Sequence, residues 1–317
     1  MEQEGGNVTT LPSSAAWFAG GTGPTVAQHL YAGETHDARL EQEGWNAPGF
    51  SPAAPWPPAR AMNASALLLG PLAPAITPAA VAGEPLPLAG PPVPVTDHGT
   101  AALLYDFSFI AAALCTLDVA PLAPPAGAAF TLTFGQVRQG FPAPFQADTP
   151  MYRPFTSNCG CPSSAAAWPS PPCACNCAPQ NQTYIAGAKT LYTYTPSFFY
   201  SAGRYVQLSV SNWPGAPALG TLPATTVTCR RLYTGGLNPP LLRTSFPSAP
   251  ALEALQAMTV RTHLANYVTV PSDCPHRERR GWTGDGRKCF NANHPAHQKP
   301  TLPKKQTRTQ TLPPPKP

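Results

Sequence analysis

Short β-prone runs separated by Pro/Gly turns dominate the middle of the chain. They occupy residues 93–97, 101–119, 128–137, 182–187, 190–210 and 226–233. Runs of this length, bounded by turn residues, are typical of antiparallel sheets. The pattern predicts a mainly β fold whose central part is an antiparallel β-sandwich.

Within residues 204–210, RYVQLSV, the side chains alternate in a way that separates two faces. Successive side chains of a strand point to opposite sides of its sheet. The face that we expect to point into the core carries Val206, Leu208 and Val210. The opposite face carries Tyr205, Gln207 and Ser209.

A helical period occurs at residues 250–263, PALEALQAMTVRTH. Its apolar stripe comprises Leu252, Leu255, Met258 and Thr262. Pro250 suits a first turn, and Ser248 is placed to cap the helix. Such a stripe needs a partner surface, and the remaining sequence offers no evident one.

The composition divides the chain into structured and unstructured parts. With 44 Pro and 25 Gly in 317 residues, it approaches the roughly 25–30% typical of low-complexity chains. Its 43% hydrophobic and 11% charged residues exclude a fully disordered, highly charged chain. We expect the end of a β domain at residues 1–51, a Pro/Ala-rich linker with short extended pieces at 52–92, a β-sandwich at 93–234 with a Cys/Pro-rich insertion at about 141–180, a helical region at 244–290 and a disordered basic Pro-rich tail at 291–317.

The net charge of +5 comes from the C-terminal part. From His276 onward there are ten Lys or Arg against two acidic residues, whereas the preceding residues hold ten basic and thirteen acidic groups. A nucleic-acid surface needs basic residues spread over a folded face, so nucleic acid is not an expected partner. The N-terminus shows no signal peptide, and the sequence contains no membrane span, so we expect a soluble chain.

Five of the nine Cys crowd into the insertion, at positions 159, 161, 173, 175 and 177. Dependable zinc sites use paired C-x-x-C or C-x-x-C with His, a spacing that this cluster lacks. We therefore interpret it as a surface insertion, with metal binding as the alternative, and expect no metal or other cofactor. The sequence leaves the redox state of the Cys open.

Two further groups of side chains allow a functional interpretation beside a structural one. Trp17, Trp45, Trp56 and Trp213 could line a sugar-binding face, but Trp within β modules is more often part of the core, and we expect the core. The neighbouring pairs His36–Asp37 and Asp97–His98 could serve as acid and base. Neighbouring strand residues point to opposite faces, so we expect surface residues instead.

The sequence SDCPHRERRGWTGDG, residues 272–286, concentrates charged groups, Gly and a Trp. Carboxylates beside an aromatic platform suit a polar ligand such as a sugar. The plainer interpretation is a solvated loop in which Glu278 pairs with Arg277, Arg279 or Arg280. The charge pattern alone favours the solvated loop.

DCPHRERRGWTGD resembles the signature of the bacterial-type α-L-rhamnosidases, glycoside hydrolase family 78, at every fixed position. GPTVAQHLYAGETHDARLEQEGWNAPGF resembles the end of that family's N-terminal β domain, YDFSFIAAALCTLDV the opening of its concanavalin-like sandwich, and FFYSAGRYVQLSV one of its strands, with Ala202 where the family has Gly. LRTSFPSAPALEALQ resembles the lead-in to the catalytic barrel. The resemblance covers about two-thirds of the chain.

The resemblance implies an inverting hydrolysis of terminal α-L-rhamnose from a glycoside or polysaccharide, in which one protonated carboxyl group acts on the leaving-group side. Glu278 would be that general acid. Asp273, Arg277, Trp282 and Asp285 would bind the sugar. Arg277 and Arg279 complicate this assignment, because nearby cations lower the pKa of a carboxyl group.

In that family the signature lies near the start of an (α/α)6 six-hairpin barrel, and the general base lies far downstream. No Asp or Glu follows Asp285 in this sequence. We therefore expect residues 244–290 to be the start of an incomplete barrel, residues 1–51 the remnant of the N-terminal domain, and the chain alone to be an inactive fragment. The alternative is a noncatalytic carbohydrate-binding β-sandwich protein that keeps a vestigial motif.

Overall fold

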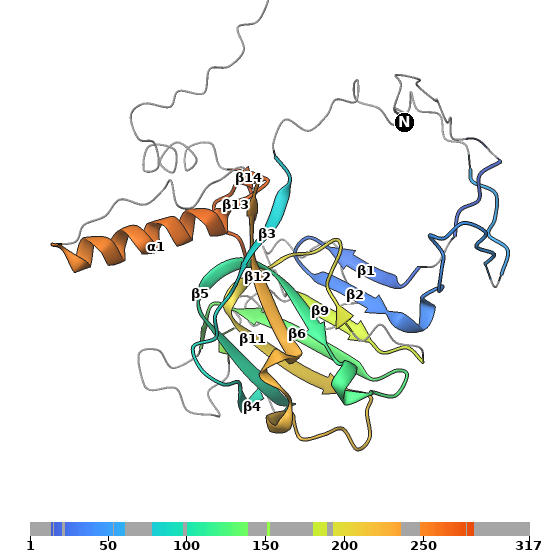
Figure 1. Ribbon diagram of the computed structural model, residues 1–317, viewed down its shortest axis with the longest axis horizontal. Coiled ribbons are helices and arrows are strands. Elements are labelled where there is room, and N and C mark those ends of the chain that lie inside the picture. Colours follow the sequence, from blue (N-terminus) through green and yellow to red (C-terminus); the bar gives the residue numbers. More distant parts are fainter. Residues whose placement is uncertain are drawn as a thin grey trace, which may run out of the picture.

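The computed structural model describes most of the predicted β regions and the helical region (Figure 1). The described residues are 14, 16–20, 23–52, 54–60, 78–97, 100–138, 151–152, 180–188, 193–235, 248–276 and 278–281. Most of the predicted Cys/Pro-rich insertion and all of the predicted tail lie outside these residues.

Ten described strands form one curled sheet, which confirms the mainly β class (Figure 1). Its main path runs β1 (Thr25–His29), β2 (Gly33–Asp37), β9 (Asn181–Ile185), β6 (Ala129–Gly135), β11 (Ser201–Ser211), β5 (Thr100–Asp118), β12 (Val227–Thr234) and β3 (Ala80–Pro85). Both β4 (Val93–Asp97) and β10 (Thr193–Tyr194) pair with β5. The pairs are antiparallel except β2 with β9, so the sheet is mixed.

The remaining described elements are short, apart from one helix. Two further antiparallel pairs are β7 (Val137–Arg138) with β8 (Met151–Tyr152), and β13 (Tyr267–Val268) with β14 (Val270–Pro271). The 3-10 helices are η1 (Ala38–Leu40), η3 (Ala120–Leu122), η5 (Leu219–Thr221) and η6 (Ala224–Thr226). The helix α1 spans Pro250–Asn266.

A bulge in β5 lets this 19-residue strand curl the sheet. Along β11, Gly203 pairs with Ala111 but Tyr205 pairs with Asp106, so several residues of β5 bulge out between two partners. Ser108 in the bulge has a left-handed φ of 66°, and its N–H donates to Asp106 at 2.9 Å. Asp106 also accepts two hydrogen bonds of 2.7 Å from the Arg204 guanidinium, which ties the bulge to β11.

The main core lies inside this curl and is built from alternating residues of the long strands. Val206 and Leu208 are buried in it and Val210 packs against it, as the alternation predicts. The opposite face of β11 is covered as well, because Tyr205 joins a second buried cluster and Gln207 is buried. A strand buried on both faces is expected at the centre of a curled sheet.

The strand β2 enters the sheet beside β9, although about 150 residues separate the two in sequence. Gly33 begins β2 at a left-handed φ of +120° opposite Asn181. A Cβ at this position would lie 1.6 Å from the Asn181 carbonyl oxygen. Only Gly permits this close approach, which brings the N-terminal hairpin of β1 and β2 into the main sheet.

The helix α1 begins at Pro250 as predicted and extends away from the sheet (Figure 1). Its N-cap is Ala249, which makes no side-chain capping bond, so the predicted cap at Ser248 is wrong. The apolar stripe of Leu252, Leu255 and Met258 is exposed. No described residue covers this stripe, as the sequence indicates.

The helix meets the sheet through side chains outside that stripe. Val260, Leu264 and Ala265, near the C-terminal end of α1, are buried, and the helix contacts β5 and β12. Arg261 adds a cationic contact 5.4 Å from the centre of the Phe109 ring of β5. The second half of the helix is therefore fixed to the sheet, which places the chain that follows it beside the β strands.

A disulfide joins the two strands on which α1 rests. Cys115 of β5 and Cys229 of β12 are direct cross-strand neighbours, with Cα atoms 4.0 Å apart. Both are buried, and they are separated by 114 positions in sequence. Cross-linking two such distant positions restricts the unfolded chain and so stabilises the folded one.

Replacing Cys115 and Cys229 together by Ala is expected to lower the free energy of unfolding by roughly 2–4 kcal/mol, because the loop constraint on the unfolded chain is lost. Urea unfolding followed by Trp fluorescence measures the change. Cys274→Ala removes a free thiol outside the sheet and serves as the control, with an expected change below about 1 kcal/mol. Equal stability of the double variant and the unsubstituted chain would contradict the prediction.

Candidate functional site

The described part of the signature forms a closed loop, residues 272–281, which we call the motif loop. Asp273 and Glu278 lie within it, whereas Arg277, Trp282 and Asp285 lie outside the described residues. The structure thus places two of the five predicted site residues and leaves the other three as predictions.

The chain reaches the motif loop through the small β13–β14 hairpin. Thr269, at its turn, has a left-handed φ of 71°, and its N–H donates to Thr234 Oγ1 at 2.8 Å. Thr234, at the end of β12, in turn donates to the Tyr267 carbonyl at 3.1 Å. Ser272 N–H donates back to the Asn266 carbonyl at the end of α1, at 2.9 Å. The start of the motif loop is therefore fixed to both the helix and the sheet.

Asp273 closes the motif loop through backbone and side-chain bonds to Arg280. The Asp273 N–H donates to the Arg280 carbonyl at 3.0 Å, and the Arg280 N–H donates to Asp273 Oδ1 at 3.1 Å. Inside the loop, the Cys274 thiol donates to Asp273 Oδ2 at 3.4 Å and accepts from the Glu278 N–H at 3.3 Å. These bonds hold the backbones of the two acidic residues in one small turn.

The surroundings of Asp273 favour its ionised form. Burial raises the pKa of Asp273, but hydrogen bonds, first those from the backbones of Arg280 and Cys274, outweigh it. The pKa of Asp273 therefore lies below its ordinary 3.8.

Arg279 is the buried charged residue among the described residues of the motif loop, with 8% of its surface exposed. Its guanidinium donates to the Pro275 carbonyl at 2.8 Å, to Gln180 Oε1 at 3.0 Å, to the Tyr200 carbonyl at 2.9 Å and to the Leu30 carbonyl. It also lies 4.1 Å from the centre of the Tyr200 ring. Desolvation lowers the pKa of Arg279 from its ordinary value.

Two further contacts join the motif loop to the sheet. The Tyr31 hydroxyl, in the turn between β1 and β2, donates to the Glu278 carbonyl at 2.9 Å. The Gln136 amide, just after β6, forms a 2.7 Å hydrogen bond with Nδ1 of His276. The backbone of Glu278 is therefore held by the N-terminal hairpin as well as by its own loop.

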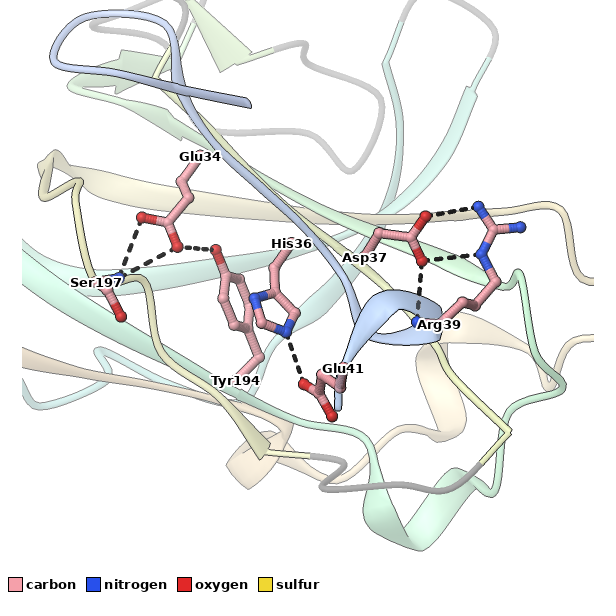
Figure 2. Close-up of polar contacts among 7 residues, drawn as sticks. All are labelled: Glu34, His36, Asp37, Arg39, Glu41, Tyr194 and Ser197. Carbon is pink, nitrogen blue, oxygen red and sulfur yellow. Dashed lines mark hydrogen bonds and ion pairs between the residues drawn. The ribbon is translucent and has the colours of Figure 1, made fainter. Parts of the chain in front are cut away.

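The β2 strand also fixes the backbone that leads to Tyr200, a contact of Arg279. Figure 2 shows the bonds of Glu34 to Tyr194 and Ser197. Glu34 of β2 is 2% exposed, and its carboxylate accepts from the Tyr194 hydroxyl at 2.8 Å, from the Ser197 N–H at 3.1 Å and from the Phe198 N–H at 2.7 Å. Burial, followed by the negative charge of Glu34, raises the pKa of Tyr194. Glu34 thereby orders the segment that leads to Tyr200.

The expectation that His36 and Asp37 are surface residues is wrong (Figure 2). Asp37 is buried and accepts three hydrogen bonds from Arg39, one from its N–H at 3.0 Å and two from its guanidinium at 2.9 and 2.7 Å. His36 Nε2 lies 2.7 Å from Glu41 Oε1. The two side chains do point to different partners, as expected of neighbours on a strand. His98 and the Asp97 side chain lie outside the described residues.

The Trp prediction is wrong for two of four residues. Trp17 is 52% and Trp45 is 65% exposed. Trp56 is half-buried, while Trp213 packs against the main core with its ring 6.0 Å from that of Phe130. The exposed pair comes from loops that carry many Pro and Gly residues, where a Trp has few neighbours to cover it.

Sequence reasoning missed the structural partners of the motif loop. It treated Arg279 only as a cation near Glu278, and it assigned no role to Tyr31, Gln180 or Glu34. No sequence signal identifies these residues, because each acts on a segment far away in the chain. Among the described residues, no group of three or more His, Cys, Asp or Glu could hold a metal ion. No helix in the described ranges is long and apolar enough to cross a membrane.

Two regions of the chain match known protein families. Residues 1–79 match the α-L-rhamnosidase N-terminal domain, and residues 244–298 match the bacterial α-L-rhamnosidase six-hairpin glycosidase domain. The second region contains α1 and the motif loop.

Full-length relatives show the same similarity. An α-L-rhamnosidase of Streptomyces avermitilis is 29% identical over 286 residues, which are 90% of this chain and 23% of the relative. The crystal structure of Streptomyces avermitilis α-L-rhamnosidase complexed with L-rhamnose has a TM-score of 0.58 at 25% identity, over 86% of this chain and 22% of that one. The α-L-rhamnosidase of Aspergillus terreus has a TM-score of 0.59 at 22% identity, over 90% of this chain and 28% of that one.

Two regions of the chain are thus similar to the N-terminal domain and to the start of the six-hairpin glycosidase domain of α-L-rhamnosidases, which confirms the resemblance that the sequence indicates. The chain spans about a quarter of the length of these relatives.

Glu34→Gln is expected to lower the free energy of unfolding by about 2–4 kcal/mol. The Tyr194 hydroxyl and the N–H groups of Ser197 and Phe198 lose their carboxylate acceptor, and one of these donors then faces the NH₂ group of the amide, which cannot accept its hydrogen bond. Glu41→Gln is the matched control in the same hairpin. The Glu41 side chain is 28% exposed and, among the residues drawn in Figure 2, bonds only to His36, so its loss is expected to cost less than about 1 kcal/mol. Urea unfolding measures both variants, and equal losses would refute the special role of Glu34.

Proposed function

We propose that this chain supplies the acid-bearing side of an α-L-rhamnosidase active site, with Glu278 as the general acid. Asp273, Arg277, Trp282 and Asp285 bind the rhamnose unit. The observation that supports this function best is the closed turn in which the Cys274 thiol contacts both Asp273 Oδ2 and the Glu278 N–H, so that the two acidic residues of the signature lie in one small loop.

In an inverting glycosidase, the protonated carboxyl group donates its proton to the departing glycosidic oxygen while a second carboxylate activates water across the ring. Glu278 performs the first task in this proposal. The second task needs a carboxylate on the opposite face of the sugar, and no Asp or Glu follows Asp285 in the sequence. The 317 residues by themselves are therefore expected to contact the sugar on its leaving-group side without completing the reaction.

The 317-residue chain is expected to release no 4-nitrophenol from 4-nitrophenyl α-L-rhamnopyranoside above the buffer rate. The reason is the missing general base. Turnover that disappears in Glu278→Gln would overturn the expected incompleteness, yet would support Glu278 as the acid. Turnover that persists in Glu278→Gln would overturn both statements.

A chimera tests the acid role directly. Residues 272–285 of this chain replace the matching segment of the Streptomyces avermitilis relative, and kcat and KM are measured on the same substrate. We expect the chimera to hydrolyse it and Glu278→Gln within the chimera to lower kcat by about 10²–10⁴-fold, because the proton donor is lost. Arg280→Gln, at the exposed neighbouring position, is the matched control. An active chimera that tolerates Glu278→Gln would refute the proposal.

A second candidate function is noncatalytic carbohydrate binding. The exposed rings of Trp17 and Trp45 favour it, because aromatic faces serve as platforms for sugars. Calorimetric titration of the 317-residue chain with L-rhamnose separates the candidates. Saturable binding that is lost in Trp45→Ala and kept in Trp213→Ala would support the binding module, whereas absence of saturation would exclude it for this sugar.

A further inference from the structure

The socket around Arg279 is built from three segments that lie far apart in the sequence. We use this name for the Leu30 carbonyl, the Gln180 side chain, and the carbonyl and ring of Tyr200. These partners are separated from Arg279 by 249, 99 and 79 positions. A buried guanidinium needs all its donors satisfied, because an unpaired buried charge is strongly destabilising.

The socket is held rigid by bonds that do not involve Arg279. Gln180 accepts from the Ala202 N–H at 2.8 Å and donates to the Ala202 carbonyl at 3.1 Å, so its side chain is fixed to β11. Its own N–H donates to the Tyr31 carbonyl at 3.1 Å. Glu34 orders the backbone before Tyr200 through Ser197 and Phe198 (Figure 2). The acceptors therefore stand in place before the guanidinium enters.

We propose that Arg279 is a positioning residue, which docks the motif loop into this socket and so fixes the place of Glu278 on the β domain. The three acceptors of the socket, together with the Pro275 carbonyl of the motif loop, suit the planar fork of a guanidinium, and the Tyr200 ring covers one of its faces. Tyr31 completes the contact through its hydrogen bond to the Glu278 carbonyl. The N-terminal hairpin thus acts on the acid directly.

This inference rests on the proposed function for the role of Glu278, whereas the docking itself does not depend on hydrolysis. Backbone geometry supports it independently. Arg279 has a left-handed φ of 51°, which is uncommon for a residue other than Gly. Its guanidinium lies against Gln180 and Tyr200. The side chain of Arg280, the next residue, is exposed.

The test uses the thiol of Cys274 as a reporter in the complete 317-residue chain. This thiol bonds to Asp273 and to the Glu278 N–H, so it is protected only while the motif loop stays closed. Alkylation by iodoacetamide, mapped to the peptide that contains Cys274, is expected to be at least about tenfold faster in Arg279→Ala. Arg280→Ala is the matched control and is expected to leave the rate unchanged, because its described bonds come from its backbone.

Chemical rescue distinguishes two causes of faster alkylation in Arg279→Ala, namely an empty socket and a general loss of structure. Millimolar methylguanidinium is expected to restore Cys274 protection in Arg279→Ala, because the preformed socket still offers its acceptors. Arg279→Lys is expected to remain fast, since one ammonium group cannot serve four acceptors in a fork. An unchanged alkylation rate in Arg279→Ala would refute the docking, and so would full protection in Arg279→Lys.

A milder variant covers the case in which Arg279→Ala does not fold. Tyr31→Phe removes only the hydroxyl that bonds to the Glu278 carbonyl. Hydrogen exchange of the Glu278 amide is expected to accelerate severalfold, with no change in the amides of β11. Unchanged exchange at Glu278 would refute the contribution of the hairpin. An inactive chimera combined with intact protection of Cys274 would instead refute the proposed acid role and leave the docking supported.

Discussion

The site depends on two buried side chains of opposite charge, Glu34 and Arg279, which both bind to one short segment. The N–H groups of Ser197 and Phe198 donate to the Glu34 carboxylate, and the Tyr200 carbonyl accepts from the Arg279 guanidinium. Leaving either charge buried without partners would be costly, because desolvating an unpaired ion costs several kcal/mol. The N-terminal hairpin and the motif loop are thereby coupled through a stretch that belongs to neither.

Much of the fold follows from local pattern, and what does not follow is set by distant pairing. The alternation in β11 identified Val206 and Leu208 as core residues, and the helical period located the start of α1 at Pro250. The strand β3 lies in a Pro-rich stretch, for which the sequence indicated only short extended pieces. It can join the sheet because it is an edge strand, and an edge strand tolerates a Pro that a central one would not. The parallel pairing of β2 with β9 depends on the close approach at Gly33 and has no local signature.

The same division applies to the site. Asp273 and Glu278 were predicted from a dense run of charged residues and its resemblance to a family signature, and the structure places both in one closed turn around the Cys274 thiol. The direction of Arg279 could not be predicted, because all but one of its acceptors lie 79 or more positions away. Charge density in a sequence therefore indicates that a site exists, while the partner that each charge finds is decided by the tertiary fold.

The direction of Arg279 also bears on a conflict within the signature itself. A cation next to a general acid opposes its function, because it favours the ionised carboxylate. In this fold the Arg279 guanidinium enters the socket, where carbonyl and amide oxygens surround it. The docking of the loop therefore directs one of the cations of the signature to oxygen atoms of the β domain.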